Sequence, residues 1–194
     1  MKNILFTLFL LPVLATAQPK IKGIGNFRLG VTTPDSLNHL GFKEEEQSYV
    51  KGTLALPCDH IRTFTAPKTD VASVVLTNVV LFFYDNELFR VTCSFTDELR
   101  TVFQAQNGIG RRLPSNTFQL CTKENKAIQV WGEGWSDTDA LALVVNRKGY
   151  NADCILDEGA TLTITSIELS DLSSECNLRN NDPLIEEYLE LLIH

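Results

Sequence analysis

The stretch VWGEGWSDTD, residues 130–139, gathers the side chains best suited to chemistry in this sequence. Trp131 and Trp135 flank Glu133, and Asp137 follows two residues after the second tryptophan. Indole rings beside carboxylates can hold a sugar, and tryptophan is enriched at the energetic centres of protein interfaces. A strand end with a solvated turn would explain the same residues. We expect Trp135, Glu133 and Asp137 to form a binding site, with Trp131 in the core and Trp135 exposed; if the stretch is a surface site, both tryptophans are candidate contacts.

A hydrolase is the alternative for the same stretch. It would need Glu133 and a second carboxylate, such as Asp137, about 5 to 9.5 Å apart. A second candidate is Cys58 with His60, because residues two apart on a strand share a face. That pair could be a nucleophile with its base or half of a metal site. A disulfide cysteine beside a surface histidine is the simpler explanation, since the sequence has three histidines in all. We assign no catalytic residue and expect a protein that is not an enzyme.

The glycine-rich stretch GIGNFRLG, residues 23–30, is a candidate for a phosphate-binding loop. The dinucleotide fingerprint G-x-G-x-x-G needs a third glycine at the position of Arg28. We therefore expect Phe27 and Leu29 to form a short strand and Gly30 to turn the chain. The acids Asp153 and Asp157 do not have the spacing of a calcium loop. No cofactor and no metal is expected.

Two segments carry the start and stop signals of helices. In TTPDSLNHLGF, residues 32–42, Thr33 can cap a helix that Pro34 begins and Gly41 ends. In TDELRTVFQAQNG, residues 96–108, Thr96 can cap a helix that ends at Asn107 and Gly108.

About four strands are expected after each of these helices. The expected strands are 47–56, 60–66, a hairpin of 71–84 and 87–95, then 116–122, 126–134, 140–148 and 161–170. A short C-terminal helix, 181–194, would carry an apolar stripe of Leu184, Tyr188, Leu191 and Leu192. The expected fold is α+β, with two tandem helix-plus-about-four-strand halves, 27–95 and 96–180, whose antiparallel sheet is covered by helices.

The opening IKGIGNFRLGVTTPDSLNHLG resembles that of two exported families, the β-lactamase inhibitor proteins and the small outer-membrane assembly lipoproteins. Their pattern is (I/F)-x-x-G-M-T-x-x-x-(V/L)-x-x-x-L-G. It is matched here by Phe27, Gly30, Thr32, Leu40 and Gly41, with Val31 in place of Met and Leu37 one residue after the (V/L) position. The hairpin VLFFYDNELFRV resembles the strand pair that follows in both families. The resemblance implies a helix-plus-hairpin repeat and, from the inhibitor family, a concave sheet face that holds a protein partner.

The N-terminus has the pattern of a secretory signal peptide. Lys2 precedes an apolar run, and small residues at Ala15 and Ala17 precede Gln18. We expect cleavage after Ala17, a linker over 18–26, and a periplasmic or secreted protein without a membrane span.

The cysteines fit such an oxidising compartment. There are five, and no C-x-x-C motif. We expect the pairs Cys93–Cys121 and Cys154–Cys176, although four cysteines alone allow three pairings.

Composition narrows the class of partner. The chain carries 17 basic and 24 acidic residues, for a net charge of −7, and no basic run is longer than Arg111-Arg112. Nucleic-acid binding rests on clustered lysines and arginines, so no nucleic acid is expected. The sequence predicts an exported binding module for an envelope or extracellular protein, with the hydrolase or a carbohydrate-binding protein as the alternative.

Overall fold

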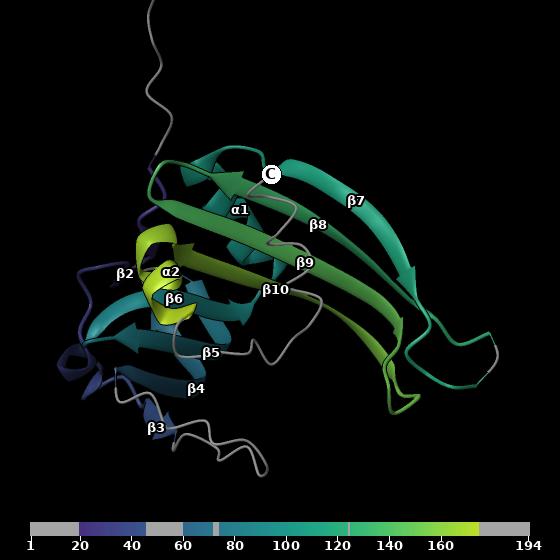
Figure 1. Ribbon diagram of the computed structural model, residues 1–194, viewed down its shortest axis with the longest axis horizontal. Helices are drawn as coiled ribbons and strands as arrows, with labels where there is room; N and C mark the ends of the chain where they lie inside the picture. The colour runs from purple at the N-terminus through teal and green to yellow at the C-terminus, as the bar shows by residue number, and fades with distance from the viewer. Residues whose placement is uncertain (1–19, 46–59, 72–73, 124, 175–194) are drawn as a thin grey trace, which may run out of the picture.

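The protein folds around one large antiparallel sheet. A computed structural model describes residues 20–45, 60–71, 74–123 and 125–174 (Figure 1). The first part contains β1 (Gly23–Ile24), β2 (Phe27–Arg28), the 3₁₀ helix η1 (Pro34–Leu37), β3 (Lys43–Glu45), β4 (Ile61–Val71), β5 (Val74–Tyr84) and β6 (Glu87–Ser94). The second part contains α1 (Asp97–Asn107), β7 (Arg111–Phe118), β8 (Ile128–Ser136), β9 (Ala140–Tyr150), β10 (Leu156–Ser166) and α2 (Ile167–Ser174).

The sheet has eight strands in the order β3-β4-β5-β6-β10-β9-β8-β7, and all neighbours are antiparallel. β1 and β2 form a separate small hairpin. The strands β3 to β6 and β7 to β10 each run as a meander, and the two meanders join where β10 pairs with β6. In Figure 1 the strands β7 to β10 continue as a curved sheet beyond both helices.

Two local predictions are confirmed. β5 and β6 form the expected hairpin around Asp85 and Asn86, both at positive φ (47° and 69°), as a two-residue primed turn requires. α1 begins after Thr96, whose hydroxyl accepts a hydrogen bond from the amide of Leu99, and it ends at Gly108 with φ 77°. Both the turn and the helix ends depend only on residues that are close together in sequence.

The predicted fold class is wrong. The sheet is not covered by helices in two tandem halves: the described residues are mostly strand, and the segment 32–42 forms only the four-residue η1. Thr33 makes no side-chain capping bond there, and Leu40, which a longer helix would bury, is 37 % exposed. This segment buries too little apolar surface to stabilise more than one helical turn.

The ends of other elements also differ from prediction. β10 stops at Ser166, and α2 takes over from Ile167 inside the expected strand 161–170. The expected strand 60–66 is part of the longer β4. The expected strand 47–56 and helix 181–194 lie outside the described residues.

The sheet has two unlike faces, which we name after the helices on them. On the α1 face, the Phe103 ring of α1 lies 5.1 Å from that of Trp135 on β8, over a large core that includes Phe83, Val91 and Leu162. On the α2 face, the hydroxyls of Ser170 and Thr165 are 2.6 Å apart. Because side chains alternate along a strand, each residue of β8 or β9 can be assigned to one face by its register.

Candidate functional site

Asp137 builds the turn between β8 and β9. One carboxylate oxygen accepts hydrogen bonds from the amides of Asp139 and Ala140, each at 2.8 Å. The other accepts from the amide of Ile21 at 2.5 Å. Lys20 forms an ion pair with Asp139 and lowers the pKa of that carboxyl through their hydrogen bond. The predicted binding residue Asp137 is therefore engaged in fastening the N-terminal segment to the turn.

Glu133 is engaged on the α1 face. Its carboxylate accepts from Arg100 at 2.7 Å and from Gln104 at 3.3 Å, both on α1. The Arg100 guanidinium also lies 4.8 Å from the centre of the Phe95 ring and donates to Asn146 at 3.4 Å. This network holds α1 on the sheet.

Trp135 is buried beneath the end of α1, so the prediction that it is exposed is wrong. Its side chain is 7 % exposed, and the indole N–H donates to the carbonyl of Gly108 at 2.9 Å. A Cβ atom on Gly110 would lie 2.7 Å from the indole ring, which explains a glycine at that position.

Trp131 is the more exposed of the two tryptophans, not the core residue that the sequence predicts. It is 36 % exposed. Residues 131, 133 and 135 point to one face because the pairing of β8 with β9 continues without a shift through Gly132 and Gly134. α1 covers Glu133 and Trp135 and leaves Trp131 beyond its reach.

The surface around Trp131 follows from the strand register. Trp131 pairs with Asn146, which pairs with Ala160, and the next row joins Gln129 to Lys148. We call the side chains on this part of the α1 face the distal α1 face. Its members are Thr117, Gln129, Trp131, Asn146, Lys148, Tyr150, Leu156, Glu158 and Ala160.

The distal α1 face mixes apolar and charged contacts. Leu156 is 64 % exposed in a row with Tyr150. Lys148 and Glu158 form an ion pair of 2.9 Å, with both side chains well exposed. The ammonium of Lys126 lies 4.5 Å from the centre of the Tyr150 ring. Of this surface the sequence analysis identified only Trp131. The other residues are ordinary strand residues, and no motif marks them.

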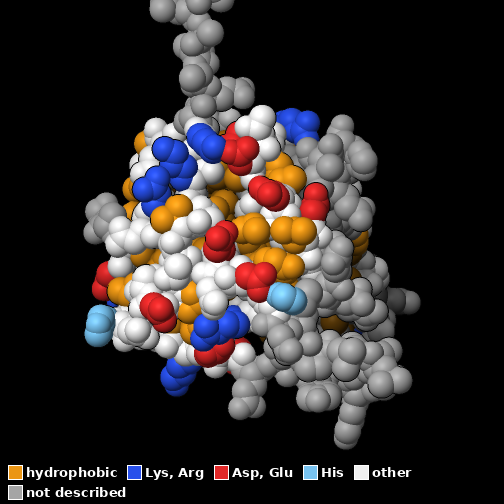
Figure 2. All heavy atoms as spheres, turned by 60° about the vertical axis from the view of Figure 1, so that its left-hand side comes forward, with side chains coloured by type: hydrophobic (Ala, Val, Ile, Leu, Met, Phe, Trp, Pro, Cys, Tyr) orange, Lys and Arg blue, Asp and Glu red, His pale blue; other side chains and the backbone are white. Residues whose placement is uncertain are grey.

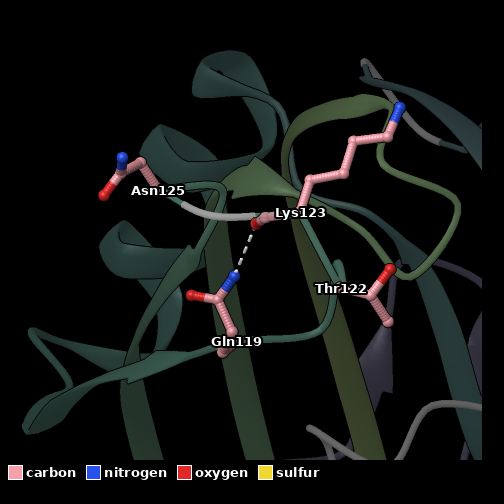
Figure 3. Close-up of a pocket in the computed structure, with 4 residues that line it drawn as sticks. All are labelled: Gln119, Thr122, Lys123 and Asn125. Carbon is pink, nitrogen blue, oxygen red and sulfur yellow. Dashed lines mark hydrogen bonds between the residues drawn. The ribbon is translucent and has the colours of Figure 1, made fainter.

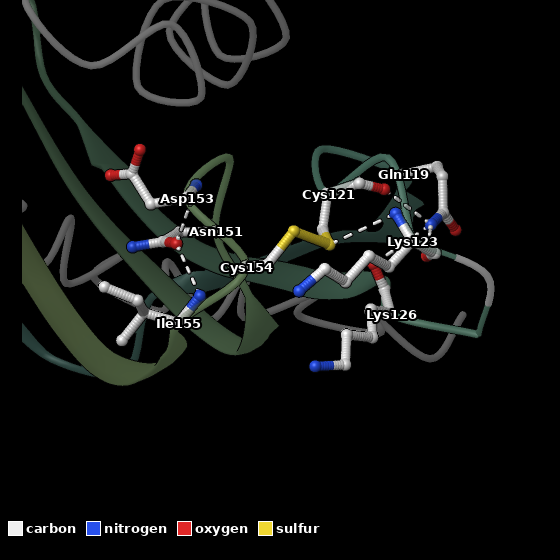
Figure 4. Close-up of a disulfide and its surroundings, with 8 residues drawn as sticks. All are labelled: Gln119, Cys121, Lys123, Lys126, Asn151, Asp153, Cys154 and Ile155. Carbon is white, nitrogen blue, oxygen red and sulfur yellow. Dashed lines mark hydrogen bonds between the residues drawn. A yellow bond between two sulfur atoms is a disulfide. The ribbon is translucent and has the colours of Figure 1, made fainter.

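A disulfide closes the tip of this sheet. Cys121 and Cys154, 5.0 Å apart at their Cα atoms, join the β7–β8 connection to the β9–β10 turn (Figure 4). The side-chain Oδ1 of Asn151 accepts hydrogen bonds from the amides of Asp153 and Ile155 in that turn. Both predicted pairings are therefore wrong, because Cys121 and Cys154 bond to each other. Cys93 is a buried free thiol, while Cys58 and Cys176 lie outside the described residues.

Gln119 organises the loop beside the disulfide. Its side-chain NH₂ group donates to the carbonyls of Cys121, Lys123 and Lys126 at 2.8, 3.0 and 3.1 Å. A surface hollow of about 360 Å³ lies here, lined by Gln119, Thr122, Lys123 and Asn125 (Figure 3). The lysine and asparagine side chains extend away from the loop in Figure 3, so they do not converge on a common point.

A second hollow, of about 300 Å³, lies between the N-terminal segment and α2. Its lining carries three basic and three acidic side chains: Lys20, Lys22, Arg28, Glu87, Asp139 and Glu168. Figure 2 shows the side of the molecule that is on the left of Figure 1, where acidic and basic side chains stand among hydrophobic ones. This balance of charge favours no ligand class.

The remaining sequence candidates have structural roles. The His60 ring is 2.6 Å from the carboxylate of Asp85 and stacks on Tyr84, on the exposed end of the β5–β6 hairpin. Gly30, with φ 68°, turns the chain as predicted, and its amide donates to the carbonyl of Leu88 rather than facing a phosphate.

Neither the arrangement of possible metal ligands nor similarity to known proteins points to a further site. Within the described ranges, no group of three His, Cys, Asp or Glu side chains is placed to hold a metal ion. In the same residues, no helix has the length and apolar character to cross a membrane. No protein-family model, no curated protein and no solved structure matches the chain.

Proposed function

We propose that this protein is an exported binding module that recognises a protein partner through the distal α1 face. The observation that carries the proposal is the solvent-exposed indole of Trp131, on a sheet face that extends past α1. Tryptophan buries a large area at low conformational cost, which suits it to anchor an interface.

The neighbours of Trp131 favour a protein partner. Leu156 and Tyr150 offer apolar area, and the ion pair of Lys148 with Glu158 lies between them and the tryptophan row. The core of a protein interface is enriched in tyrosine and tryptophan, and its rim is polar and solvent-accessible. The resemblance to the inhibitor family points to the same use of a sheet face.

Export is supported by two features. One is the leader-like N-terminus, and the other is the disulfide between Cys121 and Cys154, which suits an oxidising compartment.

The hydrolase alternative loses support from the carboxylates it would use. Glu133 is bonded to Arg100 and Gln104, and Asp137 to three backbone amides. A general base in a hydrolase must lie within hydrogen-bond reach of the substrate or of a water molecule.

Site-specific photo-crosslinking tests the proposal. A benzophenone amino acid is placed at Gln129, beside Trp131, in cells that export the protein. The matched control is Ile109, which is 89 % exposed and lies between α1 and β7. We expect a specific protein adduct from position 129 and none from 109, and Trp131→Ala should remove it.

Affinity for the captured partner should fall about 30-fold in Trp131→Ala, as for an anchor worth about 2 kcal/mol. The same adducts from both positions, or Trp131-dependent binding to a glycan array without any protein adduct, would contradict the proposal.

A further inference from the structure

A second apolar surface lies on the α2 face of the strands β7 to β9. We call it the α2-face cluster. Its members are Leu113, Phe118, Ile128, Val130, Leu143 and Val145. Ile128, Leu143 and Val145 are each exposed by 1 % or less. By register they point away from Trp131, Glu133 and Val144, so they lie on the face opposite α1.

The described helices do not account for this burial. α1 packs on the other face, and α2 packs against β6 and β10, next to the cluster. Within the described ranges, therefore, no helix lies over β7 to β9 on the α2 face. A sheet face open to water leaves its apolar side chains partly exposed, whereas a covered one hides them, so the burial of Leu143 calls for a covering layer.

The chain leaves α2 on this same face. The hydroxyl contact between Thr165 and Ser170 sets α2 on the α2 face, and the amide of Ile167 donates to the carbonyl of Asp139 at the β8–β9 turn. Residues 175–194 follow directly after α2. The cluster begins one strand away from β10, at β9.

We propose that residues 181–194 dock on the α2-face cluster through Leu184, Tyr188, Leu191 and Leu192. These positions share one side of a helix, with Glu186 and Glu190 on the other side. A helix of 14 residues is about 21 Å long. Three neighbouring strands are about 10 Å across, so the segment is long enough to cover β7 to β9.

The other long segment outside the described ranges is a poorer occupant. Residues 46–59 connect β3 to β4, at the far edge of the sheet. β4 is four strand positions from β9, or about 19 Å. Both ends of that segment are held at this edge, whereas residues 175–194 begin beside the cluster.

The docked segment, as part of the same chain, would cover the α2 face of the curved sheet. The distal α1 face would then be the face of β7 to β10 that a partner meets. The acidic side chains Glu186 and Glu190 would point outward, away from the sheet.

Cross-linking within the full chain tests the proposal. The benzophenone amino acid replaces Tyr188, on the stripe, or Glu186, on the opposite side of the same helix. After irradiation the monomer is isolated, and its cross-links are located by peptide mass spectrometry. Tyr188 should cross-link to β8 or β9, at least five times more than Glu186 does. A second stripe position, Leu192, guards against a local failure of folding, and circular dichroism verifies each variant.

Three results would overturn the inference. They are cross-links from both stripe positions to the distal α1 face, cross-links only in a covalent dimer, or equal yields from the stripe and from Glu186. Failure of the partner experiment at Gln129 would leave this result unaffected, because the two experiments probe opposite faces.

Discussion

The carboxylates of Glu133 and Asp137 are four residues apart in sequence, but their partners belong to different parts of the fold. Glu133 meets α1 through Arg100, and Asp137 meets the N-terminal segment through Ile21. The two tryptophans differ in the same way, because α1 ends over Trp135 and does not reach Trp131. At the scale of residues, the role of each of these side chains depends on which element, α1 or the N-terminal segment, packs against it.

The tryptophans give the first prediction. Trp135→Ala should lower the free energy of unfolding by about 3–5 kcal/mol, because it leaves a large cavity and an unbonded carbonyl at Gly108. Trp131→Ala should lower it by about 1 kcal/mol or less, since that side chain is part-exposed. Denaturant titration of both variants measures the difference. A greater loss for Trp131→Ala would contradict the burial described here.

Cys93 gives a prediction about pH. Burial raises the pKa of this thiol to about 12. The native state then keeps its proton where the unfolded thiol, with a pKa near 9, has lost it. The contribution of Cys93 to stability should be complete below about pH 9 and fall by about 1.4 kcal/mol per pH unit up to about 12.

The free energy of unfolding is measured for the native protein and for Cys93→Ala at pH values from 8 to 11. Tyrosines and lysines titrate in both proteins, so the difference between the two isolates the contribution of Cys93. Their difference in stability should shrink as the pH rises. A constant difference would show that the thiol titrates as it does in water.

At the scale of elements, the tip of the sheet is held by covalent and polar contacts. The strands β7 to β10 extend past both helices (Figure 1), where there is no helix among the described residues to pack against. The disulfide and the three hydrogen bonds from Gln119 replace that packing by tying the connecting loops together. Under the proposed function, a stable tip would keep the distal α1 face in one shape and so lower the entropic cost of binding.

The disulfide gives the third prediction. Cys121→Ser with Cys154→Ser should lower stability by about 2–4 kcal/mol, the usual range for a bridge that closes a loop of this length, 33 residues apart in sequence. Hydrogen exchange should speed up at residues 119–127 and 151–155 and change little in β5 and β6. Uniform acceleration over the whole sheet would instead show that the bridge holds the entire fold.

At the scale of the whole molecule, the two meanders share one continuous sheet through the pairing of β6 with β10. The α1 core runs across this junction, from Phe64 on β4 to Trp135 on β8. The expected division into the units 27–95 and 96–180 is crossed by this core, so unfolding one part exposes apolar surface of the other.

Processing gives the fourth prediction. The exported protein should have lost residues 1–17, together with the positive charge of Lys2, and should begin at Gln18. Intact-mass measurement of the exported fraction determines this directly. Retention of Met1 in that fraction would rule out the cleavage.

The sequence alone determined the features that depend on neighbouring residues. Thr96 and Gly108 bound α1 because capping is local, and Asp85 with Asn86 define a hairpin because the turn needs positive φ at both positions. Gly30 turns the chain for a similar reason.

Only the tertiary structure decided the roles of Trp131 and Trp135, the partner of Cys121 and the length of η1. Residues 131 and 135 share one face of β8 by alternation, and the position of α1, set by contacts far away in sequence, decides which of them is covered. Cys121 meets Cys154 because β8 and β9 bring two distant loops to one tip. The segment 32–42 has a helix's signals, but it buries too little apolar surface to become a longer helix.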